Sequence, residues 1–219
     1  MTKRRAAFFD MDRTILSQNS GKSWLRFQFK RGELSAAYML RAAFWQVLYR
    51  AALLDVESLV SRLVTDIKGD LEVDMLKKCE DWLEDELASL ISPAAVAQIN
   101  AHKNAGDLVV MITGATQFAA YPIAKLVGID EVLCSRLEVV DGVFTGRLES
   151  ICFGEHKVTI AEKFAGQHRV ELAKSIFYTD SYNDLPMLKR VGQGVAVNAD
   201  ARLLRQARKR GWRVENWAN

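Results

Sequence analysis

The sequence is poor in cysteine, histidine and proline, with three residues of each type among 219. The cysteines Cys79, Cys134 and Cys152 are odd in number and none forms a CxxC pair, so the pattern favours neither a disulfide framework nor a structural zinc site. No HExxH spacing is present, which argues against zinc hydrolase chemistry. We expect reduced, buried thiols in a cytoplasmic protein.

Long hydrophobic runs are also missing. The most apolar segment, residues 36–54, is interrupted by Arg41 and Arg50, whereas a membrane-spanning helix needs about 20 apolar residues. Residues 8–12 (FFDMD) place carboxylates where the apolar stretch of a signal peptide would continue. The net charge of +3 is too small to indicate nucleic-acid binding. We therefore expect no transmembrane segment, no signal peptide and no nucleic-acid partner.

Two patterns divide the chain. Apolar runs predict buried strands at 6–9, 108–112, 175–179 and 194–197, and strands alternate with helices from residue 106 onward. Residues 15–105 show helical patterns instead, and the isolated first strand needs a sheet to join. We predict an α/β fold with a Rossmann-like parallel sheet, built from 1–16 and 106–219. An all-helical domain, 17–105, is inserted after the first strand.

Local signals predict several boundaries. Ser20 is expected to cap a helix that ends at Lys30, and Asp55 a helix that ends near Gly69. Ser92-Pro93 begins another helix, and Asp200 caps the last one. A short strand is expected at 132–135, followed by a hairpin at 137–148 that turns at Asp141-Gly142.

Acidic, hydroxyl and basic residues accompany the predicted strands. Ligands of open α/β sheets bind at the carboxyl ends of the strands, so residues far apart in sequence can meet there. The candidates are Asp10, Asp12, Thr113, Gly114, Lys157, Asp180, Asn183 and Asp184.

Each of these motifs has an ordinary explanation when taken alone, as a loop, a turn, a surface lysine or a helix cap. Their order, each near a strand end, favours a common site. Paired carboxylates suit Mg²⁺. Thr113-Gly114 can hold phosphate oxygens, and Lys157 supplies a positive charge for a phosphate.

The same residues resemble the haloacid dehalogenase superfamily. Residues 10–14 (DMDRT) resemble its DxDxT signature, and 109–116 (VVMITGAT) its second motif. Lys157 resembles the third motif, and 178–188 (YTDSYNDLPML) the fourth motif in its phosphoserine-phosphatase-like form. Residues 194–212 also resemble that branch, which carries a helical cap.

The resemblance implies a magnesium-dependent phosphomonoester hydrolase. Asp10 would be the nucleophile that forms an aspartyl-phosphate, and Asp12 the general acid and base. Asp10, Asp12 through its backbone carbonyl, and Asp180 would bind Mg²⁺, with Asp184 supporting the metal site. The residues expected to contact phosphate are Thr113, Gly114, Lys157 and Asn183. Arg13 receives no role.

The helical insertion resembles the substrate-selecting cap of this superfamily, with hinges expected at 17–21 and 104–106. Asn19 stands where phosphoserine phosphatases carry a glutamate that recognises the substrate amine, which puts phosphoserine itself in doubt. The expected substrate is a small phosphorylated metabolite, phosphoserine-like or histidinol phosphate. A phosphorylated lipid head group and phosphotransfer to an alcohol are the alternatives.

Two further questions stay open at this point. The apolar helix predicted at 33–54 is either the buried centre of the cap, a dimer contact or a lipid-facing surface; the oligomeric state is therefore open too. A phosphate-binding or receiver-like module is the non-enzymatic alternative. The length of the chain, its helical insertion and Asp12 favour the enzyme.

Overall fold

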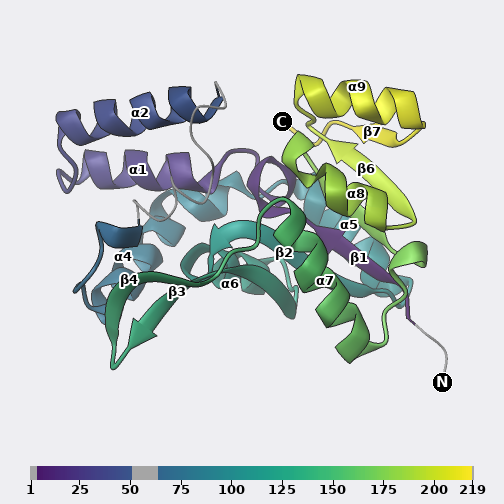
Figure 1. Cartoon of the computed structure of the whole chain (residues 1–219), viewed down its shortest axis with the longest axis horizontal. Coiled ribbons are helices and arrows are strands. Elements are labelled where there is room, and N and C mark those ends of the chain that lie inside the picture. Colours follow the sequence, from purple (N-terminus) through teal and green to yellow (C-terminus); the bar gives the residue numbers. More distant parts are fainter. Residues whose placement is uncertain (1–3, 51–63, 219) are drawn as a thin grey trace.

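A seven-stranded sheet forms the centre of the computed structural model, which describes residues 4–50 and 64–218, without the side chains of 45–50 (Figure 1). The strand order is β4-β3-β2-β1-β5-β6-β7. Every neighbouring pair is parallel except β3 with β4. The strands are β1 (Ala6–Phe9), β2 (Leu108–Thr116), β3 (Glu131–Val140), β4 (Val143–Ser150), β5 (Ile176–Thr179), β6 (Gln193–Val197) and β7 (Arg213–Glu215). The predicted α/β parallel sheet is confirmed; β7 was not predicted.

Helices cover both faces of the sheet (Figure 1). On one face, α5 (Pro93–Asn104) and α6 (Gln117–Leu126) pack against Ala7 and Phe9. On the other, α7 (Glu155–His168), α8 (Leu185–Arg190) and α9 (Ala201–Arg210) pack against Ala6 and Phe8. Successive side chains of a strand point to opposite faces, so a strand that is apolar throughout needs both faces covered.

Several predicted boundaries are confirmed. Ser92 caps α5 and Asp200 caps α9 through their side-chain oxygens. Asp141 and Gly142 both have positive φ, 50° and 76°, as a two-residue hairpin turn requires. The strand expected at 132–135 is confirmed, and it is continuous with the first strand of the hairpin in β3.

Among the described residues of the insertion, the helices are α1 (Ser20–Lys30), α2 (Ala36–Arg50) and α4 (Glu72–Trp82). The predicted cap Ser20 is wrong, since the Asn19 side chain accepts the hydrogen bond from Lys22 N and α1 begins after it. Single helical turns complete the described elements: η1 (Met11–Ile15), η2 (Leu83–Leu87), η3 (Ala88–Leu90), η4 (Leu172–Lys174) and η5 (Tyr182–Asp184). Most of the helix predicted after Asp55 lies outside the described residues.

The two connections between sheet and insertion run side by side. Leu16 and Ile91 form an antiparallel bridge, and Ser17 N donates to Leu90 O at 2.7 Å. The next helix, α5, packs on the sheet, where its Ile99 shares a core with Phe9. The part of the insertion that does not pack on the sheet therefore lies between Leu16 and Ile91.

The β3–β4 hairpin holds the insertion at a third place. Gly69 N donates to Phe144 O at 2.9 Å, and Phe144 N donates back to Asp70 O at 3.0 Å. Phe144 also packs in a small core with Val64 and Cys79 of the insertion. These contacts attach the far side of the insertion to the sheet.

Helix α2 lies at the outside of the molecule, along α1 (Figure 1). It begins at Ala36 rather than at 33, and Leu40 and Phe44 are 74% and 59% exposed. The interpretation of this helix as the buried centre of the cap is therefore wrong for the described side chains, 36–44. The rest of the predicted segment lies outside the described residues or side chains. In the part of the chain that the structure describes, no helix could cross a bilayer.

Candidate active site

Two carboxylates follow neighbouring parallel strands at the same edge of the sheet. Asp10 comes directly after β1 and Asp180 directly after β5, and Asp10 N donates to Tyr178 O at 2.9 Å. Both aspartates are buried, at 6% and 8% exposure. The parallel pairing of β1 with β5 thus joins two predicted site residues that are far apart in sequence.

Lys157 lies in the first turn of α7, and its side chain extends to the same edge of the sheet. Its Nζ donates to Asp10 Oδ1 at 2.6 Å and to Asp184 Oδ2 at 2.8 Å, and the residue is 2% exposed. Burial lowers the pKa of Lys157, but the negative charges of Asp10 and Asp184 raise it by more than burial lowers it. The pKa of this ammonium therefore lies above its ordinary value. The ammonium therefore stays charged between two carboxylates.

Thr179 is a member of this cluster that sequence reasoning missed. Its hydroxyl donates to Asp184 Oδ2 at 2.6 Å, the same oxygen that Lys157 binds. The only signal was its place in the last position of β5, directly before Asp180.

Acidic side chains outnumber basic ones in this buried cluster. Burial raises the pKa of Asp10 well above its usual range although Lys157 lowers it, and Asp184 and Asp180 raise it further. Burial also raises the pKa of Asp180 to about 7, against the opposing effect of Arg13. A bound divalent cation would favour the ionised form of these groups, and carboxylate oxygens are the ligands that Mg²⁺ prefers.

The four predicted metal residues do not all present free carboxylates. Among the described residues, no three His, Cys, Asp or Glu side chains form a ready-made metal cluster. Lys157 binds one oxygen of Asp10 and one of Asp184, and Thr179 also binds that Asp184 oxygen. Both carboxylate oxygens of Asp12 accept hydrogen bonds from the start of α1. The carboxylate oxygens of Asp10 and Asp180 that Lys157 and Arg13 do not contact have the chemistry that a divalent cation prefers.

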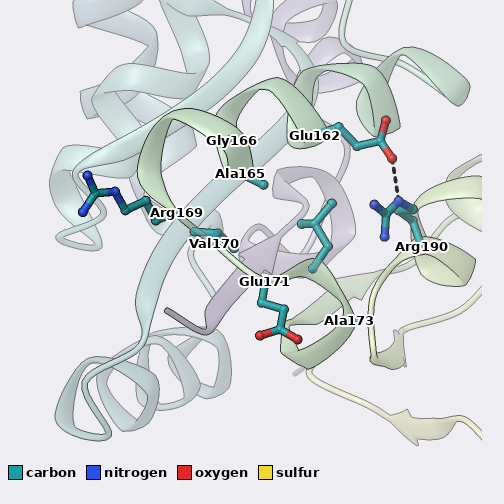
Figure 2. Close-up of a pocket in the computed structure, with 9 residues that line it drawn as sticks. Glu162, Ala165, Gly166, Arg169, Val170, Glu171, Ala173 and Arg190 are labelled. Carbon is teal, nitrogen blue, oxygen red and sulfur yellow. Dashed lines mark hydrogen bonds and ion pairs between the residues drawn. The ribbon is translucent and has the colours of Figure 1, made fainter. Parts of the chain in front are cut away.

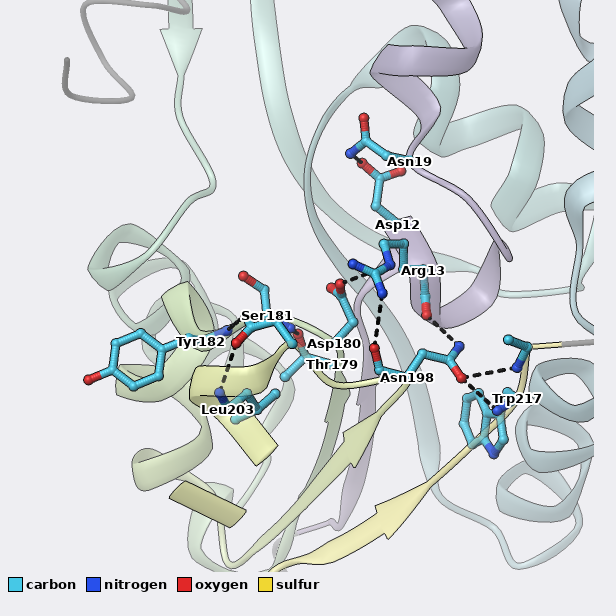
Figure 3. Close-up of polar contacts among 12 residues, drawn as sticks. Asp12, Arg13, Asn19, Thr179, Asp180, Ser181, Tyr182, Asn198, Leu203 and Trp217 are labelled. Carbon is cyan, nitrogen blue, oxygen red and sulfur yellow. Dashed lines mark hydrogen bonds and ion pairs between the residues drawn. The ribbon is translucent and has the colours of Figure 1, made fainter. Parts of the chain in front are cut away.

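The Asp12 side chain is held by the start of α1 (Figure 3). Asn19 Nδ2 donates to Asp12 Oδ2 at 2.6 Å, and Ser20 N donates to Asp12 Oδ1 at 2.8 Å. Burial raises the pKa of Asp12, against the lowering effect of the Ser20 hydrogen bonds. A raised pKa favours the protonated form, which a general acid needs. Asn19 also caps α1, so both ends of its amide are used within the protein.

Arg13, to which the sequence analysis gave no role, faces the same cluster. Its Nε lies 3.6 Å from Asp180 Oδ2, and its Nη2 donates to Asn198 O at 3.3 Å (Figure 3). Its position inside the DMDRT segment was the available signal. Asn198 was missed because nothing in the sequence connects it with residue 13.

The remaining predicted residues surround the cluster. Thr113 is the last buried residue of β2, whose Met111 lies opposite Phe9, and its hydroxyl accepts from Ala115 N at 3.1 Å. Gly114 lies against the segment before Lys157, where an added Cβ would meet Phe153 at 3.4 Å. Asn183 lies in η5, between Asp180 and Asp184, with its N–H on Ser181 Oγ at 3.2 Å.

A cavity of about 520 Å³ lies at the opposite edge of the sheet (Figure 2). Val170, one of its lining residues, pairs with Arg4 just before β1, at the amino ends of the strands. Two other lining residues, Glu162 and Arg190, bind each other at 2.6 Å. This cavity is therefore separate from the aspartate cluster.

The chain is similar to a family of known proteins and to individual relatives in it. Residues 7–189 match the model of the haloacid dehalogenase-like hydrolase family. A phosphoserine phosphatase of Mycobacterium tuberculosis is 31% identical over 217 residues, which cover 97% of this chain and 70% of the relative. A histidinol-phosphatase of Neisseria meningitidis serogroup C is 28% identical over 223 residues, with 98% and 99% covered.

The structure also resembles solved ones. A crystal structure of a protein of unknown function from Bordetella pertussis Tohama I superposes with a TM-score of 0.89 at 29% identity, and covers 98% of this chain and 99% of that one. The family match includes every candidate acidic residue, from Asp10 to Asp184. The chain belongs to the haloacid dehalogenase-like hydrolase family.

Proposed function

We propose that the protein is a magnesium-dependent phosphomonoester hydrolase that works through an aspartyl-phosphate on Asp10. The observation that carries this proposal is the contact of Lys157 with both Asp10 and Asp184 inside the protein, beside Asp180. A buried cation beside a carboxylate nucleophile can bind the transferring phosphoryl group and offset the negative charge that develops on it.

The reaction has two steps in this proposal. A carboxylate oxygen of Asp10 attacks phosphorus, the bond from phosphorus to the ester oxygen breaks, and Asp12 gives its proton to the leaving oxygen. Water then attacks the aspartyl-phosphate, Asp12 takes a proton from this water, and the bond from phosphorus to Asp10 breaks. Inorganic phosphate leaves and the Asp10 carboxylate is restored.

Asp10, Asp180 and the backbone carbonyl of Asp12 would hold Mg²⁺, with Asp184 fixed behind them by Lys157 and Thr179. When bound, the ion supplies positive charge that stabilises the transferring phosphoryl group. Thr113, Gly114 and Asn183 are proposed to contact the phosphate oxygens, because β2 and η5 bring them to the same edge of the sheet.

The substrate is proposed to be a small phosphorylated metabolite, the class named by the phosphoserine phosphatase and histidinol-phosphatase relatives. Asn19 argues against a substrate ammonium at its position. A neutral amide pairs weakly with a cation, and this amide is already bound to Asp12 and to the start of α1.

The inserted helices are proposed to act as a cap. Because α5 packs on the sheet and Leu16 pairs with Ile91, the cap comprises about 17–91 rather than 17–105. The start of α1 binds Asp12 directly, so a movement of this cap would change the surroundings of the proposed acid.

A panel of phosphomonoesters tests the proposal by phosphate release with Mg²⁺ and with EDTA. We expect magnesium-dependent release from at least one ester, and its loss in Asp10→Asn. Adding alcohol acceptors to the same assay separates the phosphotransferase alternative, which would yield a new phosphate ester in place of inorganic phosphate. Absence of release from every ester, with or without Mg²⁺, would contradict a hydrolase.

A further inference from the structure

Arg13 and Asn198 form a reciprocal pair across 185 positions of sequence (Figure 3). Asn198 Nδ2 donates to the backbone oxygen of Arg13 at 2.8 Å, and Arg13 Nη2 donates to the backbone oxygen of Asn198 at 3.3 Å. Both residues have left-handed backbones, with φ of 55° and 47°. Asparagine tolerates this conformation better than most residues, whereas arginine adopts it uncommonly, so the loop at Arg13 needs support from its surroundings.

Asn198 also binds the end of the chain. Its Oδ1 accepts from Trp217 N at 2.8 Å and from Ala218 N at 3.0 Å, and its own N–H donates to Glu215 O at 3.0 Å. All hydrogen-bonding groups of Asn198 are thus used. Its backbone oxygen and its Nδ2 bind Arg13, and its Oδ1 and backbone N–H bind residues 215–218.

The tail itself is anchored firmly. Trp217 is buried, its ring centre lies 5.4 Å from that of Tyr178, and its backbone oxygen accepts from Ser92 Oγ at 3.0 Å. Phe9, the residue before Asp10, packs in the same aromatic group, with its ring 6.5 Å from Trp217. Asn198 is therefore bonded to a segment that is itself held by a buried side chain and a hydrogen bond to Ser92.

We propose that Asn198 is a positioning residue for the proposed reaction, through which the C-terminal tail (213–218) holds the loop that carries Asp12. Asp12 has two attachments in this arrangement: its side chain is held by α1, and the residue that follows it by Asn198. The same pair aims the Arg13 guanidinium at Asp180. The role of Asp12 in this inference rests on the proposed function; the attachment of the loop does not.

Two variants separate the contribution of the Asn198 side-chain donor from that of its side-chain acceptor. Asn198→Gly permits the left-handed backbone but removes every side-chain contact. Asn198→Asp keeps the acceptor for Trp217 and Ala218 and loses the donor to Arg13 O. The matched control is Asp141→Gly, which replaces another left-handed residue with φ of 50°, in the hairpin turn away from the aspartate cluster.

Leaving-group dependence reports the position of Asp12. A p-nitrophenolate leaves without a proton, whereas an alkoxide needs one, so a misplaced acid should harm kcat/KM for an alkyl phosphate more than for p-nitrophenyl phosphate. We expect both Asn198 variants to show a selective loss of roughly tenfold or more, with the 10²–10⁴-fold that general acid–base catalysis contributes as the upper limit. An equal loss on both esters, or a wild-type ratio in Asn198→Asp, would overturn the positioning role.

Hydrogen–deuterium exchange tests the attachment without any assay of activity. In the metal-free protein, the amides of Arg13 and Leu16, which bond to Gln18 O and Met11 O, should exchange faster in both Asn198 variants than in wild type and in Asp141→Gly. Unchanged protection of this loop would refute the attachment even if the protein proved to be a phosphatase. Faster exchange would support it even if no phosphomonoester were cleaved.

Discussion

Lys157 Nζ lies 2.6 Å from Asp10 Oδ1, inside the protein and 147 positions away in the sequence. The same ammonium binds Asp184, so one cation serves two buried acids. With Asp180 beside them, acidic side chains outnumber basic ones in the cluster. The stability of this site therefore depends on each of its charged groups.

Replacement of Asp10 by asparagine should abolish hydrolysis while the fold persists. The amide cannot attack phosphorus, and removal of a nucleophile lowers kcat by about 10⁴-fold or more in enzymes that form covalent intermediates. Its oxygen can still accept from Lys157. Phosphate release and circular dichroism would be measured together; turnover at the wild-type rate would show that Asp10 is not the nucleophile.

Lys157→Met should destabilise the protein by about 3–5 kcal/mol, because it leaves Asp10 and Asp184 buried without their cation. Urea unfolding measures this loss. The control is Lys174→Met, whose exposed ion pair with Glu171 should contribute less than about 1 kcal/mol. A similar free energy of unfolding for both variants would contradict a buried charge cluster.

The metal-free protein should lose stability as pH rises from about 4 to about 7. Burial raises the pKa of Asp180 to about 7 in the folded state. In the unfolded state this carboxyl ionises near its ordinary pKa, so between these values the folded protein binds the extra proton. Stability then falls with rising pH, by up to about 4 kcal/mol, since one pKa unit corresponds to about 1.4 kcal/mol.

Magnesium should reverse this loss, since it binds the ionised carboxylates. At a concentration of about 100 times Kd, Mg²⁺ would stabilise the protein by about 2.7 kcal/mol. Unfolding at pH 5 and pH 8 with EDTA or Mg²⁺ would show it, and Asp180→Asn should flatten the pH profile. Equal stability at the two pH values in EDTA would contradict the raised pKa.

Two leucines test the position of α2. Leu40 is 74% exposed, so Leu40→Ala should change the free energy of unfolding by less than about 0.5 kcal/mol. Leu87, 1% exposed, should cost about 2–5 kcal/mol on the same replacement. Thermal unfolding in dilute solution gives both values. A large loss for Leu40→Ala would place that side chain in a core or in a stable contact between copies.

The thiols should resist modification in the native protein. Burial raises the pKa of Cys134 to about 11 and that of Cys79 and Cys152 to about 12. Only the thiolate reacts rapidly with disulfide reagents such as DTNB, so we expect little reaction at pH 8 until urea unfolds the chain. Fast labelling of a native thiol would show that it is exposed.

The main parts of the site could be predicted because its residues follow strands that local patterns identify. Asp10, Thr113 and Asp180 each come near the end of an apolar run, and parallel strands bring such ends to one edge. Patterns of this kind do not reveal whether a side chain is free. The hydrogen bonds of Asp12 with Asn19 and Ser20, and of Asp184 with Thr179, became visible only in the structure.

For the helices too, the sequence predicted where an element begins but not what it packs against. The start of α5 at Ser92-Pro93 was predictable from capping chemistry, but its packing on the sheet was not, because an amphipathic helix does not specify its partner. Likewise, the apolar composition of α2 predicted a helix but not its exposure.

The sequence by itself determined the α/β class, the family and the residues that carry charge to the edge of the sheet, since these depend on apolar periodicity and on short motifs. The tertiary structure decided which charges meet, that Arg13 faces Asp180, and that Asn198 joins the tail to the loop after Asp12. Such contacts depend on how distant segments pack and on the hydrogen-bonding needs of buried groups, which only the folded chain satisfies.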